Sequence, residues 1–149
     1  RGEIDMFKKI LLPTDGSELS VKAMQGALKM AGQLGASVVG LTVVEPYSYS
    51  TLSEYRPETL EAFEARNAQA AEQRLAPLVQ AAKDAKVPCE TVTVKSFSPY
   101  EAIIETATKH GCDVIFMASH GRRGLSAVLL GSETQKVLTH STIPVLVYR

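Results

Sequence analysis

The chain has 149 residues, of which 45% are hydrophobic and 21% are charged, and its 16 basic and 16 acidic side chains balance to zero net charge. This composition indicates one globular domain with a full core, and it gives no electrostatic support for binding nucleic acid or an anionic membrane. No apolar run approaches the roughly 20 residues that a membrane-spanning helix needs. We therefore expect a cytoplasmic protein with no nucleic-acid or membrane partner.

The ends of the chain and its cysteines suggest a simple organisation. We expect residues 1–5 to be a leader, with no secretory signal, and residues 6–149 to form a single domain. Cys89 and Cys112 lie far apart and form no CxxC pair. This spacing argues against a zinc site and gives no reason to expect a disulfide.

The first apolar run, residues 8–15, predicts a short strand that stops at Gly16. Ser17 fits the N-cap of a following helix, and Gly35 fits the residue that ends it. Apolar residues recur between them at helical spacing: Val21, Met24, Leu28, Ala31 and Leu34. Residues 37–44 are nearly all apolar, which predicts a second, buried strand.

Residues 46–57 are rich in Ser and Tyr and predict a loop that is more mobile than the rest. The next helix contains Pro77, which should kink or break it. One face of this helix is predicted to carry Leu60, Phe63, Ala71, Leu75, Leu78 and Ala82. Residues 90–95 alternate between polar and apolar, which predicts a third strand at the edge of a sheet.

The last part of the chain predicts a helix, a strand, a second helix and a strand. Ser98 and Pro99 fit the cap and first residue of a helix that ends at Gly111. Its inward residues are predicted to be Ile103, Ile104 and Ala107. Residues 113–118 predict the fourth strand, residues 133–138 a helix, and residues 143–148 the last strand, with Pro144 near its start.

This alternation predicts an α/β fold with a doubly wound, five-stranded parallel sheet in the order 3-2-1-4-5 and helices on both faces. In that order the first and fourth strands are neighbours at the switch point of the topology. Ligands of open α/β sheets bind there, in the crevice at the carboxyl ends of the strands. Asp15 and the loop after the fourth strand both come to this crevice.

That loop carries the most informative pattern, Ala118-x-x-Gly121, nine residues, then Gly131-Ser132. A loop between a strand and a helix directs backbone N–H groups and the positive end of a helix dipole at one place, which suits a phosphate chain. We expect the two glycines to allow close approach of the backbone and positive φ. The absence of GxxxxGK[ST] and GxGxxG excludes the familiar nucleotide motifs.

Several polar residues here have two interpretations. Asp15 fits either a turn residue or a ribose ligand, and Ser132 fits either a capping box with Gln135 or a phosphate contact. Arg122 and Arg123 are either solvated or bound to phosphate, and Glu133 favours the helix dipole and could help hold Mg²⁺.

The three histidines carry no recognisable catalytic or metal-binding arrangement. His120 lies in the loop and could serve as a general base, but no partner for it is visible. His110 and His140 lie near predicted helix C-termini, which suits the helix dipole. We therefore assign no catalytic residue and no metal ligand.

These motifs resemble those of the universal stress protein family. The resemblance covers residues 6–149 and rests on residues 10–17, on the glycine pattern and on residues 143–147. The nucleotide-binding branch has Gly-x-x-Gly, nine residues, Gly-Ser/Thr, and here Ala118 replaces the first glycine. The resemblance implies an adenine nucleotide alpha hydrolase-like fold and a homodimer paired through the last strand.

The resemblance also implies an ATP-binding stress-response module, holding ATP, AMP or ADP with Mg²⁺, that acts through occupancy and hydrolyses slowly at most. Two alternatives are an adaptor that binds no nucleotide, which Ala118 favours, and a slow ATPase. The implied contacts to adenine and ribose are Pro13, Thr14, Asp15 and Val43. Those to ribose and phosphates are Met117, Ala118, Gly121, Gly131, Ser132 and Glu133, with Arg122 and Arg123 as further candidates.

Overall fold

The computed structural model describes residues 6–48, 58–121 and 130–149. The predicted leader at residues 1–5, most of the predicted loop at residues 46–57, and both Arg122 and Arg123 lie outside the described residues.

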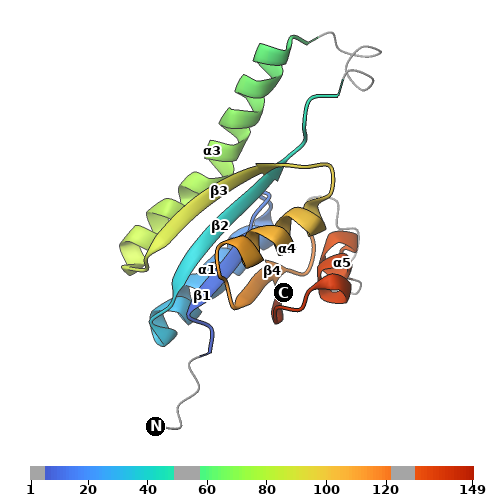
Figure 1. Cartoon of the computed structure of the whole chain (residues 1–149). Helices are drawn as coiled ribbons and strands as arrows, with labels where there is room; N and C mark the ends of the chain where they lie inside the picture. The colour runs from blue at the N-terminus through green and yellow to red at the C-terminus, as the bar shows by residue number, and fades with distance from the viewer. Residues whose placement is uncertain (1–5, 49–57, 122–129) are drawn as a thin grey trace.

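The described strands form one five-stranded parallel sheet in the order β3-β2-β1-β4-β5 (Figure 1). This order confirms the predicted 3-2-1-4-5 arrangement. The strands are β1 (Lys9–Pro13), β2 (Ser37–Val44), β3 (Cys89–Lys95), β4 (Val114–Ala118) and β5 (Val145–Tyr148).

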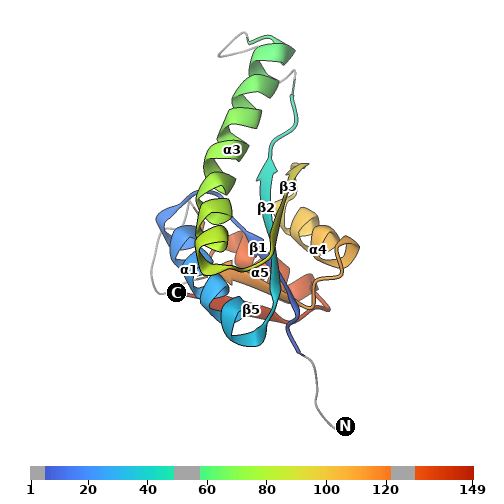
Figure 2. The same cartoon turned by 90° about the vertical axis from the view of Figure 1, so that its left-hand side faces the viewer.

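Helices cover both faces of the sheet, as predicted, and Figure 2 shows the two layers from the side. Ile10 and Leu12 of β1 belong to the core beneath α1 (Glu18–Leu34) and α3 (Leu60–Ala85). Leu11 faces the other way, into the core beneath α4 (Pro99–Lys109) and α5 (Ser132–His140). The strand period of two thus divides one apolar run between two cores.

Helix α1 confirms both predicted caps. The Ser20 N–H donates to the Ser17 hydroxyl at 3.2 Å, and Gly35 ends the helix at φ +65°. Of the apolar residues that recur at helical spacing, Met24, Leu28 and Ala31 are buried, whereas Val21 is 37% and Leu34 is 48% exposed. The stripe facing the sheet instead runs along Ser20, Ala23, Met24, Ala27, Leu28 and Ala31. These positions follow the 3.6-residue period; Val21 lies at the margin of this stripe, and Leu34 is the last residue of the helix.

Of the kink or break predicted at Pro77, the break does not occur, because helix α3 continues through this residue. Pro77 is exposed, so water can satisfy the carbonyl group that loses its hydrogen bond there. Leu60, which the sequence analysis places on the same helix face as Phe63, is 50% exposed. It is the first residue of α3, and both views show this end of the helix projecting beyond the sheet.

Both predicted edges of the sheet are present. Strand β3 forms one edge and alternates between exposed and half-buried residues over most of its length. Strand β5 forms the other, and Pro144 lies directly before it, where its carbonyl accepts from the Ile115 N–H at 2.9 Å. Among the described residues, no helix is long and apolar enough to cross a membrane.

Gly40 of β2 offers a test of how tightly α3 packs on the sheet. A Cβ atom at Gly40 would run into the side chain of Leu78, which is fully buried. Gly40→Ala should therefore lower the free energy of unfolding by about 1–3 kcal/mol, because a well-packed core resists added volume. Gly32→Ala is the matched control, since a Cβ at this exposed α1 position meets nothing within 4 Å.

The control should raise the free energy of unfolding by up to about 1 kcal/mol, because alanine favours a helix more than glycine does. Urea unfolding of the two variants measures both effects. Equal changes in the two variants would show that α3 does not pack closely over Gly40.

Candidate functional site

The ends of β1 and β4 meet where the sequence predicted a binding site. The two strands are adjacent in the sheet, with Ile10 opposite Val114 and Leu11 opposite Ile115. Just beyond β1, Asp15 Oδ1 accepts a hydrogen bond from the Ser17 N–H at 2.9 Å. The other oxygen faces the glycine loop, because a Cβ built on Gly121 would lie 2.7 Å from Asp15 Oδ2. Asp15 therefore acts as a turn residue and also borders the loop.

The two ends of the glycine loop lie close together. The Gly131 N–H donates to the Ser119 carbonyl at 2.8 Å, and a Cβ on Gly131 would lie 3.3 Å from both Ser119 O and His120 Cα. Gly131 thus lies close to the backbone of Ser119 and His120. The predicted positive φ is wrong, since Gly131 has φ −63° and Gly121 is not among the positive-φ glycines. The lack of room for a side chain, rather than a backbone conformation that favours glycine, accounts for these glycines.

Ala118 occupies the first position of the pattern without strain. It is the last residue of β4, is 8% exposed and is not among the described residues with positive φ. A strand residue tolerates a Cβ atom, so alanine fits where the pattern has glycine. The buried Thr134 hydroxyl donates to the Ala118 carbonyl at 3.1 Å and joins α5 to the end of β4.

The start of α5 differs from the predicted capping box. Gly131, rather than Ser132, is the N-cap residue, and Ser132 is the exposed first residue of the helix. The Gln135 side chain therefore reaches back to the Leu130 carbonyl at 3.0 Å instead of to the backbone N–H of Ser132. A capping box requires Ser132 at the N-cap, but the helix begins one residue earlier than that, so Ser132 lies inside it. This arrangement leaves the first turn of α5 facing the end of β4.

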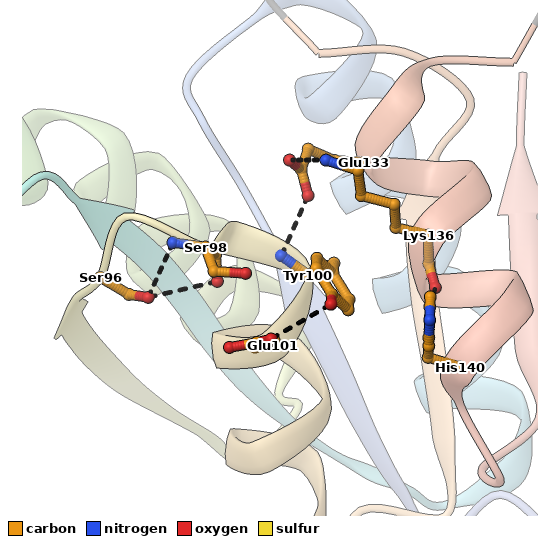
Figure 3. A network of polar contacts seen from close by, with 7 residues as sticks. All are labelled: Ser96, Ser98, Tyr100, Glu101, Glu133, Lys136 and His140. Carbon is orange, nitrogen blue, oxygen red and sulfur yellow. Dashed lines mark hydrogen bonds and ion pairs between the residues drawn. The ribbon is translucent and has the colours of Figure 1, made fainter.

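Glu133 points toward Tyr100 of α4 (Figure 3). Its Oε2 accepts from the Tyr100 N–H at 3.0 Å, and its Oε1 lies 3.4 Å from Lys136 Nζ. The Ser98 hydroxyl makes no capping hydrogen bond, although Ser98 is the predicted N-cap of α4. Glu133 thus supplies the cap from a neighbouring helix, which satisfies an N–H group that the first turn of a helix leaves without a partner.

The same network packs α4 against α5. The Tyr100 and His140 rings lie 5.0 Å apart between centroids, and Lys136 Nζ lies 5.7 Å from the Tyr100 ring (Figure 3). The Tyr100 hydroxyl donates to Glu101 at 3.1 Å, and this hydrogen bond raises the pKa of Tyr100 above its ordinary value. His140 ends α5 and His110 caps the end of α4, so both lie near helix C-termini, as predicted.

His120 and Ser119 form a buried pair at the start of the loop. His120 is 6% exposed and its Nδ1 lies 2.9 Å from the Ser119 hydroxyl. Its Nε2 is buried and has no hydrogen-bond partner within the part of the chain that the structure describes. No described group of three His, Cys, Asp or Glu side chains is placed to hold a metal ion.

Val43 and Arg74 border the site from the side of β2. Strand β1 ends at Pro13, opposite Leu41, so β2 runs on beyond its neighbour. The Arg74 guanidinium reaches from α3, and its Nη1 lies 3.3 Å from both the Val43 carbonyl and the Thr42 hydroxyl. The sequence analysis did not single out Arg74, because an arginine in the middle of a polar helix usually faces solvent.

A family model for the universal stress protein family matches residues 6–149. The chain belongs to this family. It is 33% identical over 150 residues to the universal stress protein YxiE of Bacillus subtilis, covering 97% of this chain and all of that one.

Solved universal stress proteins share the fold. The chain is similar to protein MJ0577 of Methanocaldococcus jannaschii, with a TM-score of 0.75, 30% identity and 95% of both chains covered. It also shares the fold of a family member from Arabidopsis thaliana with AMP bound, with a TM-score of 0.65, 17% identity and coverage of 94% and 90%. The fold and family resemblances drawn from the sequence are thereby confirmed.

The predicted site residues of this universal stress protein divide into three groups. Asp15, Gly121 and Gly131 come together at the carboxyl ends of β1 and β4, with Ser132 in the adjoining first turn of α5. Pro13 and Thr14 lie at the end of β1, Val43 lies on β2, and Met117 and Ala118 end β4. Glu133 lies on α5 with its carboxylate engaged on the α4 side. Thr134 and Arg74, which the sequence analysis missed, join these elements.

The Glu133 cap can be tested on the stability of α4. Glu133→Ala should lower the free energy of unfolding by about 1 kcal/mol, because caps of this kind are worth that much. The amide hydrogen of Tyr100 should also exchange faster with solvent. Glu105→Ala, an exposed glutamate on α4, is the control and should change neither quantity beyond the small helix-propensity effect. An unchanged exchange rate at Tyr100 in Glu133→Ala would contradict the cap.

Proposed function

We propose that this universal stress protein binds an adenine nucleotide with Mg²⁺ and acts in the cytoplasm as a stress-response binding module. The observation that carries the proposal is the meeting of Asp15 and Gly121, since a Cβ on Gly121 would lie 2.7 Å from Asp15 Oδ2. A carboxylate that accepts hydrogen bonds and a loop that leaves room for phosphate thus lie side by side. The AMP bound to the Arabidopsis thaliana family member supports the same ligand class.

The proposed ligand lies along the carboxyl edge of the sheet. The base lies beside Val43, Pro13 and Thr14, and the ribose hydroxyls donate to Asp15. The phosphates lie against Gly121, Gly131 and Ser132, where the first turn of α5 presents N–H groups and the positive end of its dipole. Met117 and Ala118 end the strand below the ribose, and Arg122 and Arg123 are further phosphate contacts in the proposal.

Mg²⁺ would be held chiefly by the phosphates, since this ion keeps several waters and binds nucleotide oxygens. Both Glu133 oxygens already interact with Tyr100 and Lys136, so Glu133 is not proposed as a ligand of the ion. The ion would offset the repulsion between the Asp15 carboxylate and the phosphates.

In this proposal the protein signals by whether the site is occupied. Bound nucleotide changes the shape of a surface or the state of the dimer. Hydrolysis is slow at most, because fast phosphoryl transfer needs a positioned water and a cation directed at the developing charge. Backbone N–H groups bind the ground state as well as the transition state, which does not raise turnover. The alternative of an adaptor that binds no nucleotide rests on the replacement of glycine by Ala118. The backbone at Ala118 is extended, so this position does not require glycine and the replacement is weak support for that alternative.

Gly121→Val tests the nucleotide site. The branched side chain would occupy the space between the loop and Asp15 and should weaken ATP binding at least tenfold in isothermal titration calorimetry with Mg²⁺. Gly32→Val is the control, because that position on α1 has nothing within 4 Å. Equal ATP affinity in Gly121→Val and the parent protein would refute the site.

We further propose a homodimer that pairs β5 of two copies. The Pro144 and Tyr148 carbonyls accept hydrogen bonds from Ile115 and Ser119 on the β4 side, so Val145 and Val147 direct their peptide groups to the open edge. An open apolar edge is a ready site for pairing with a second strand.

Val147→Pro tests this dimer. Proline removes one outward N–H and leaves the hydrogen bonds to β4 in place, so the dimer should dissociate at concentrations where the parent protein remains paired. Val147→Ala, which keeps the N–H, is the control for the smaller side chain. Sedimentation velocity over a range of concentrations gives the result, and a monomeric parent protein would exclude the pairing.

A further inference from the structure

The Val43 peptide faces the place where β1 has ended. In a parallel sheet, alternate residues direct their N–H and C=O groups to the same neighbouring strand. The Leu41 carbonyl accepts from the Thr14 N–H on the β1 side at 2.8 Å, and the Val44 carbonyl accepts from Ser96 on the β3 side at 3.0 Å. Val43 therefore turns its carbonyl in the same direction as Leu41. Since β1 ends at Pro13, opposite Leu41, no β1 residue pairs with Val43.

Arg74 supplies the donor that β1 does not. Its Nη1 lies 3.3 Å from the Val43 carbonyl and 3.3 Å from the hydroxyl of Thr42, which is fully buried. An Nη nitrogen of arginine carries two hydrogens, so these two acceptors use both. The Arg74 Nε is also buried. The guanidinium thus holds the Val43 carbonyl from the α3 side.

A carbonyl oxygen has two lone pairs, and Arg74 Nη1 occupies one of them. The second can accept from an amino group of a ligand at the carboxyl edge of the sheet. A ligand with a carbonyl oxygen at the same position would place its lone pairs against those of the Val43 oxygen, and neither of the two oxygens carries a hydrogen to donate. The arrangement therefore favours a donor over an acceptor next to Val43.

We propose that Arg74 is a positioning residue that fixes the Val43 carbonyl as the acceptor for the exocyclic amino group of the base, and so makes the site select adenine over guanine. This inference rests on the proposed nucleotide site and adds the residue that sets its base preference. A site built to pair with a polar group of the ligand rejects an analogue that lacks it, because the buried polar group of the protein then stays unpaired.

The competing explanation is that Arg74 only satisfies the buried Thr42 hydroxyl and supports α3. Such a structural role would change stability, and it would weaken the binding of all nucleotides alike. A positioning role at Val43 instead changes the ratio of the dissociation constants for GTP and ATP. That ratio therefore separates the two explanations.

The experiment is calorimetric titration of ATP and GTP, each with Mg²⁺, into the parent protein and Arg74→Leu. The parent protein should bind ATP more tightly than GTP. Arg74→Leu should lose about tenfold in ATP affinity and change little toward GTP, so the ratio falls about tenfold, because a hydrogen bond from a charged group is worth about that much. Arg66→Leu is the matched control, since it removes the same charge from the same helix at an exposed ion pair with Glu58.

Arg66→Leu should leave both affinities and their ratio unchanged. An unchanged ratio in Arg74→Leu, or an equal fall in Arg66→Leu, would overturn the role of Arg74 while leaving the nucleotide site intact. A parent protein that binds neither nucleotide would refute the proposed function and this inference with it. Arg74→Lys, which keeps the charge but not the planar group, should also lower the ratio, and it decides the point if Arg74→Leu does not fold.

Discussion

The central position of β1 is the constraint on which the rest of the site depends. Its two neighbours are β2 on one side and β4 on the other. The chain therefore leaves β1 toward α1 on one face of the sheet and leaves β4 toward α5 on the opposite face. Two loops that depart to opposite faces open the carboxyl edge between them. Asp15 and Gly121 meet there because of this topology, although 105 residues separate them in the sequence.

The three small residues of the glycine pattern are small for different physical reasons. Gly121 leaves room for the Asp15 carboxylate, and Gly131 leaves room for the backbone of Ser119 and His120. Ala118 ends a strand, where a Cβ atom is tolerated. At two positions of this motif, neighbouring atoms lie too close for a larger side chain. At the third, the only limit on side-chain size is that the position is buried. The replacement of glycine by alanine at the first position is consistent with this division.

Polar side chains join the helices to the edge of the sheet where backbone pairing ends. Thr134 reaches from α5 to the last carbonyl of β4, and Arg74 reaches from α3 to the carbonyl of Val43. Glu133 uses the first turn of α5 to cap α4. Buried polar backbone groups cost free energy when they lack partners, so each strand or helix end recruits a donor or acceptor from a neighbouring element. These connections link the geometry of the proposed site to α3, α4 and α5.

The sequence by itself determined the strands, the sheet order and the strand ends at which Asp15 and the glycine loop meet, because apolar periodicity, glycine spacing and the right-handed crossover act locally or as general rules. It did not determine the role of Glu133, whose carboxylate caps a helix that begins 34 residues earlier in the chain. It also missed Arg74, and it did not show that Leu60 and Leu34 are about half exposed. Only the tertiary structure decided these points, since the partners of a long side chain and the reach of a helix beyond its sheet depend on which elements come to lie side by side.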